Sequence, residues 1–135
     1  MAFYNEGITA DSFRSGNDNG GFGYSSGAGS SVTQATNRTT GVTINNVCGS
    51  ITTHNASLAA EAAATFTVTN SVVEIGDVVI VSIRSGSNGG NTVAYVSTVA
   101  NGSFAITVAN NNADAGTAET GAIVINFAVF KAVTS

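Results

Sequence analysis

The last apolar run of the chain, residues 121–134, constrains the fold most. Its sequence is GAIVINFAVFKAVT, in which Ile123, Ile125, Phe127 and Val129 alternate with residues of mixed character. In an extended chain this pattern makes one side wholly apolar, as a strand packed on a core requires. The rest of the chain therefore has to supply the surface against which this strand packs.

The length and composition fit one ordinary domain with a real hydrophobic core. Of the 135 residues, 43% are hydrophobic and only 9% are charged, whereas a charged share of about 25% is usual. Thr, Ser, Asn and Gly must therefore form the exposed faces. Such a surface is typical either of a subunit that other chains cover or of a neutral monomer, and the composition leaves both open.

The charges exclude several classes of partner. The four cations, Arg14, Arg38, Arg84 and Lys131, are scattered along a chain of net charge -4. We therefore expect no nucleic-acid binding and no anchoring on acidic lipid. The first residues lack the basic and apolar regions of a secretory signal, and no apolar stretch is long enough for a membrane span, so we expect neither.

Residues 1–30 form a glycine- and serine-rich arm, distinct from the domain of residues 31–135. Glycine at this density makes regular structure entropically costly. Half of the chain's seven Phe and three Tyr residues nevertheless lie in this arm, namely Phe3, Tyr4, Phe13, Phe22 and Tyr24. We interpret these five as partner-binding residues of an extended arm that orders on contact. The alternative is a flexible tail whose rings pack on their own domain.

Beyond residue 30, short segments of alternating pattern predict an all-β fold. They cover residues 32–36, 41–45, 47–53, 65–70, 78–83, 92–100 and 103–109, and the run at the C-terminus is the eighth. Asn101-Gly102 predicts a hairpin with a type I′ turn between the sixth and the seventh. About eight short strands without proline predict an antiparallel β-sandwich of the jelly-roll or Greek-key type.

Two segments allow more than one interpretation. Residues 55–64 have helical composition, and we expect at most one or two helical turns there, with Leu58 as the buried anchor. Residues 78–83 are apolar on both sides of the extended chain. That pattern predicts either a central strand or a strand whose outer face is covered by another subunit.

The sequence offers few candidates for catalysis. Cys48, the only cysteine, and His54 would make a nucleophile and its base, but six residues of extended chain separate them by roughly 20 Å. Glu74 and Asp77 are close together in a turn, where such residues commonly bond the backbone. We therefore predict no enzyme, no catalytic residue and no cofactor.

The loop of residues 110–120 raises the question of a weak calcium site. It holds several asparagines together with Asp114 and Glu119. The alternating acids of an EF-hand are missing from it, and one Cys with one His gives no zinc spacing. We predict no metal site and leave calcium in this loop open.

Several pieces of the sequence, taken in order, resemble a group of small virion structural proteins of tailed bacteriophages. The pieces are VTQATNRTTGVTIN, a Leu-centred Ala-rich loop, FTVTNS, GDVVIV, a YVS strand and the closing AIVINFAVFKA, and they cover residues 32–132. VTQAT and INFAVFK are the most specific. The resemblance implies a β-sandwich that serves as a capsid decoration protein or as part of a fibre, and that is often trimeric.

We therefore expect a capsid decoration protein on the outer surface of a virion. As a homotrimer it would bind the major capsid protein shell and stabilise it, with the arm of residues 1–30 strengthening the attachment. The alternative is a fibre or head-fibre domain that binds a host-surface glycan. In that case the loops of residues 85–91 and 110–120 would supply amide and hydroxyl groups to the sugar.

Overall fold

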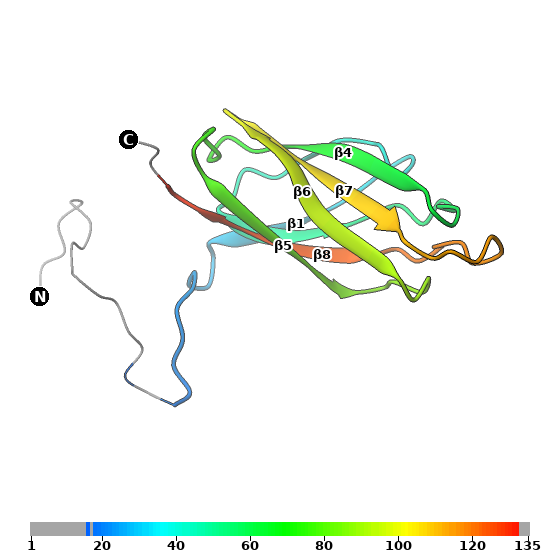
Figure 1. The fold of residues 1–135 in the computed structure, drawn as a ribbon. Coiled ribbons are helices and arrows are strands. Elements are labelled where there is room, and N and C mark those ends of the chain that lie inside the picture. The colour runs from blue at the N-terminus through cyan, green and yellow to red at the C-terminus, as the bar shows by residue number, and fades with distance from the viewer. Residues whose placement is uncertain (1–15, 17, 133–135) are drawn as a thin grey trace, which may run out of the picture.

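The computed structural model describes residues 16 and 18–132, so that Phe3, Tyr4 and Phe13 lie outside the described residues. This part of the chain forms eight strands and no helix, and hence no helix able to cross a membrane. The strands are β1 (Gly29–Thr33), β2 (Val42–Thr43), β3 (Cys48–Thr52), β4 (Ala63–Thr69), β5 (Val78–Ser85), β6 (Thr92–Ala100), β7 (Ser103–Asn110) and β8 (Val124–Phe130). They build two packed sheets, which confirms the predicted β-sandwich (Figure 1).

The chain passes back and forth between the two sheets. The first sheet has the strand order β1-β3-β8-β5, and the second has the order β2-β4-β7-β6. The antiparallel prediction is right for the four pairs that involve β7 or β8. The pairs β1–β3 and β2–β4 are parallel instead. They are parallel because each connection crosses to the other sheet, so that a strand returns to its own sheet in the same direction.

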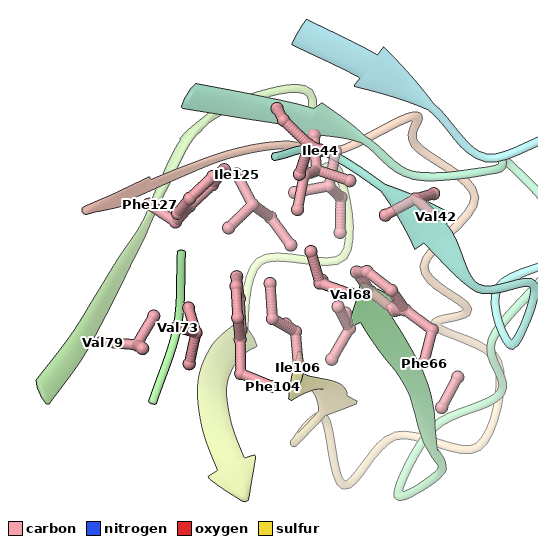
Figure 2. Packing of buried hydrophobic residues seen from close by; sticks show 14 of the residues in the cluster. Val42, Ile44, Phe66, Val68, Val73, Val79, Phe104, Ile106, Ile125 and Phe127 are labelled. Atoms are coloured by element: carbon pink, nitrogen blue, oxygen red, sulfur yellow. The ribbon is translucent and has the colours of Figure 1, made fainter. Parts of the chain in front are cut away.

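The hydrophobic core lies between the sheets and is built from alternate residues of their strands (Figure 2). Phe66 and Val68 of β4 point into it, and the threonines that alternate with them, Thr65, Thr67 and Thr69, point outward. Phe104 of β7 meets Phe127 of β8 across the sandwich, with ring centroids 5.4 Å apart. The apolar side of the C-terminal run is thus core, as its alternation predicts.

The helical turns predicted within residues 55–64 are wrong, although Leu58 is buried as predicted. The N–H and C=O groups of Leu58 bond to the C=O and N–H groups of Glu119 at 2.9 Å each. Glu61 has a left-handed φ of 58°, and β4 begins at Ala63. Extended pairing therefore satisfies a backbone that would be only marginally stable as a short helix.

The predicted hairpin at Asn101-Gly102 joins β6 and β7, but its turn is not of type I′. Only Gly102 has a positive φ, of 79°, whereas a type I′ turn needs positive φ at both central residues. Contacts with the β4–β5 connection hold the turn in this form. The Gly102 N–H donates to the Val73 carbonyl at 2.8 Å, and the Ile75 N–H donates to Asn101 Oδ1 at 2.9 Å.

The contact between Phe104 and Phe127 leads to a prediction about stability. Because Phe104 is 1% exposed, Phe104→Ala should lower the free energy of unfolding by about 3–5 kcal/mol. Tyr95→Ala is the control, since Tyr95 is 49% exposed and should cost less than about 1 kcal/mol. Urea unfolding measures both changes, and equal losses would contradict the described packing.

Candidate interaction surface

β5 is apolar on both of its faces and yet lies at the edge of the first sheet. The central-strand interpretation of residues 78–83 is therefore wrong. Val79 points into the core, whereas Val78 and Ile80 point outward and are each 52% exposed. Their side chains point away from the core, on the outer side of the first sheet, where the second sheet cannot cover them. The other interpretation, an outer face covered by another chain, becomes a proposal.

Val78 and Ile80 belong to a larger apolar surface on the outer side of the first sheet. Val78 is paired with Phe130, and Ile80 is paired with Ala128. Two rings of the arm extend this surface. Together six residues form this apolar face: Phe22, Tyr24, Val78, Ile80, Ala128 and Phe130.

Two of the five predicted arm residues, Phe22 and Tyr24, lie on the apolar face. Phe22 stacks on Phe130 with ring centroids 6.4 Å apart, and the Tyr24 hydroxyl donates to the Val129 carbonyl. Both contacts are made by side chains. Figure 1 shows the backbone of the arm (blue) leading away from the sandwich. Phe22 is still 75% exposed and Tyr24 44% exposed. Both rings therefore contact their own domain and are still partly exposed to solvent.

Two recesses open on this side of the first sheet. An apolar recess of about 310 Å³ lies between the arm and the sheet, and its floor includes Cys48 and Ala128. A shallower polar recess of about 480 Å³ is lined in part by Ser50, Arg84 and Asn126. Cys48 lines both recesses. The surface therefore changes from apolar to polar over a short distance along the strands.

Arg84 is the cation of the polar recess. It stands at a β-bulge between Ile83 and Ser85, a device that redirects a side chain. It is exposed and forms no hydrogen bond or ion pair with any residue that the structure describes. By contrast, Lys131 pairs with Asp77 at 2.6 Å and with Glu74 at 3.1 Å. Arg84 thus has no carboxylate partner among the residues that the structure describes.

At the end of β5 that follows Arg84, the carboxylate of Glu119 is buried and fully bonded. Glu119 is 0% exposed. Five groups donate to its two oxygens at 2.6–3.1 Å, namely the hydroxyls of Ser87 and Thr92 and the backbone N–H groups of Asn88, Gly89 and Gly121. The loop of residues 85–91 therefore wraps around this side chain. No sequence motif marks this centre, and the analysis of the sequence missed its structural role.

The charge of Glu119 is stabilised where it lies. Burial opposes ionisation, but the hydrogen bonds from Thr92, Ser87 and the backbone of Gly89 and Gly121 outweigh it and lower the pKa of Glu119 to about 2. Arg38 is buried beside it and donates to the carbonyls of Glu119 and Gly121. Burial lowers the pKa of Arg38, and the charge of Glu119 opposes that effect.

Two glycines allow this close packing. Gly86 has a φ of 86°, and a Cβ there would collide with the Ala122 carbonyl. A Cβ on Gly121 would collide with the Gly86 carbonyl. Because both obstacles are backbone atoms, neither position accepts a side chain without moving the loop.

The residues considered for catalysis are held apart or used in turns. Cys48 begins β3 and His54 lies beyond its end, so the strand separates them. The Nδ1 atom of His54 accepts from the Ala56 N–H at 3.0 Å. Asp77 accepts from the Glu74 N–H at 2.9 Å, which is the turn role expected from the sequence. A hydrogen bond from Lys131 is the main cause that lowers the pKa of Asp77.

The two loops considered for glycan binding do come together. Asn88 and Thr120 bond to each other through both side chain and backbone, at 2.9 and 3.0 Å, and Asn112 Nδ2 donates to the Gly89 carbonyl at 3.1 Å. The side-chain amides of Asn88 and Asn112 thus form hydrogen bonds between the two loops.

The described residues contain no cluster of three or more His, Cys, Asp or Glu side chains that could hold a metal ion.

These features describe a β-sandwich with one closed polar end and one exposed apolar face. Comparison with protein-family models, curated proteins and solved structures finds no match to this chain. The resemblance to phage virion proteins therefore remains a prediction from the sequence pattern.

The lowered pKa of Glu119 predicts a dependence of stability on pH. Because the folded-state pKa of about 2 lies below the ordinary value of 4.5, the stabilisation is complete above pH 4.5 and is lost as the pH falls toward 2. The loss should reach about 3 kcal/mol. Urea unfolding at several pH values measures it.

Glu119→Gln is the variant that isolates this contribution. Asp77 also has a lowered pKa, so the share of Glu119 is the difference between the wild-type and variant slopes. A variant that keeps the full wild-type slope below pH 4.5 would show that the bonded carboxylate is not responsible.

Proposed function

We propose that this protein is a structural subunit of a virion, a capsid decoration protein that binds the shell of major capsid protein from outside and stabilises it. The observation that carries the proposal is the apolar face, whose Val78 and Ile80 lie uncovered on an edge strand. Domains that work alone usually protect such edges and avoid such patches. The choice of a virion comes from the sequence resemblance described above.

The mechanism we propose is mechanical. Each copy contacts its neighbours through the apolar face and the aromatic arm, and so adds buried area across junctions in the shell. Burying one large apolar side chain contributes about 1.5–3 kcal/mol. With only 9% charged residues, this attachment depends little on electrostatic attraction. It should therefore be insensitive to salt.

A homotrimer is the assembly that the resemblance favours, and the apolar face is a surface through which copies can meet. The glycan-binding alternative has less support, because Asn88 and Asn112 use their amides between the loops. Tyr95, the aromatic residue considered for stacking on a sugar, belongs to β6 of the second sheet.

Binding to undecorated phage capsids tests the proposal. Val78→Thr with Ile80→Thr keeps residues that suit a strand and removes the apolar contact, so binding measured by co-sedimentation should weaken about tenfold or more. The matched control is Val93→Thr with Tyr95→Thr. These residues are 40% and 49% exposed on β6, the edge strand of the second sheet.

The control variant should bind as the wild type does, and raising the salt concentration should change neither result. Equal binding by both variants would remove the apolar face from the mechanism. Absence of binding by the wild type would remove the capsid role. Sedimentation velocity of the same proteins without capsids would reveal whether the apolar face also holds the trimer together.

A further inference from the structure

We propose that residues 1–15 of this protein bind the outer side of the first sheet, across the apolar recess and the polar recess. The inference rests on the proposed docking role of the apolar face and names the segment that covers this face until the shell replaces it. It does not depend on what the assembled protein is attached to.

The two recesses have the spacing of alternate residues in a strand. Ala128, at the floor of the apolar recess, pairs with Cys48 and Ile80. Asn126, in the polar recess, pairs with Ser50 on one side. The two rows are two residues apart along β8, which is about 7 Å. An extended segment lying along the strands would place side chains i and i+2 in the two recesses.

Residues 1–15, MAFYNEGITADSFRS, contain this spacing twice. Tyr4 is two residues before Glu6, and Phe13 is two residues after Asp11. In each pair a ring and a carboxylate lie on the same side of an extended chain. The ring suits the apolar recess, and the carboxylate suits Arg84, which has no partner among the described residues. A charge-assisted hydrogen bond there would be stronger than a neutral one.

The position of the arm brings this segment close to the recesses. Phe22 and Tyr24 already contact Phe130 and Val129 at the apolar end of the face. From Phe22 back to Phe13, an extended chain spans up to about 30 Å. From Val78 to Arg84 the face extends about 20 Å along β5. The segment can therefore reach both recesses, at a high effective concentration because it is tethered.

The charges on the outer side of the first sheet favour residues 1–15 as its occupant over the same sheet of a second copy. The outer side of the first sheet presents Arg84 and no acid among the described residues that line the two recesses. Two such faces packed together would leave both arginines without carboxylates, which is costly once they are buried. Residues 1–15 supply rings and acids together.

Cys48 allows a direct test with the full-length protein. It is the only cysteine, it is half-buried, and it lines both recesses. If residues 1–15 cover it about four fifths of the time, replacing Phe3, Tyr4 and Phe13 by serine should speed its alkylation by iodoacetamide about fivefold. The Val93→Thr, Tyr95→Thr protein is the control and should react at the wild-type rate.

A charge exchange tests the role assigned to Arg84. Arg84→Glu alone should raise the alkylation rate of Cys48. Adding Glu6→Lys and Asp11→Lys to the same chain should return the rate toward the wild-type value. A purely structural effect of Arg84 would not be reversed by changes so far away in the sequence. Failure of this rescue would overturn the assignment of the carboxylates.

Dilution separates the remaining outcomes. Protection that survives dilution supports binding by the chain's own segment, and protection lost in step with dissociation would overturn the proposal in favour of a neighbouring copy. Equal alkylation of the wild type and the serine variant would overturn the proposal, whether another surface covers Cys48 or none does. If capsid binding still depended on Val78 and Ile80 in that case, the proposed function would stand without this inference.

Discussion

Five hydrogen-bond donors converge on the buried carboxylate of Glu119, and the closed end of the sandwich depends on this interaction. A buried carboxylate without partners would cost several kcal/mol or take up a proton. Here the donors keep it charged, and the buried guanidinium of Arg38 lies next to it with its own bonds to backbone carbonyls. The two charges join the connections that follow β1, β3, β5 and β7. Segments that share no sheet pairing are thereby fixed relative to one another.

Polar contacts hold both ends of β5, and they fix the position of the apolar face. At one end, β5 leads into Gly86 and the loop that encloses Glu119. At the other end, Asp77 accepts hydrogen bonds from Lys131 and from the Glu74 N–H. Both ends of the strand are therefore held by buried or half-buried polar contacts, while Val78 and Ile80 stay uncovered between them. A surface already held in place loses little conformational freedom on binding, which favours its use in assembly.

Features of the candidate site that depend on neighbouring residues could be predicted from the sequence, whereas features that depend on contacts between distant residues could not. The double apolar pattern of residues 78–83 indicated that another chain or another strand covers β5, and the aromatic residues of the arm indicated contact. The pattern could not reveal that β5 is an edge strand, because strand order depends on pairing with β8, far along the chain. Nor could it reveal that Arg84 has no side-chain partner among the described residues. The helix wrongly expected at residues 55–64 failed for the same reason, since Leu58 pairs with Glu119 across 61 residues of chain.

The sequence by itself determined the class of fold, most of the strand positions, the inward residues of β4, β7 and β8, and the polar character of the loops. These follow from the two-residue period of an extended chain and from the burial of apolar side chains, which neighbouring residues already encode. Only the tertiary structure decided which strands lie at the edges, that β1 pairs in parallel with β3 and β2 with β4, and that Glu119 is a buried anchor. Those features depend on which distant groups meet, and the free energy of such contacts exists only once the two sheets have closed on each other.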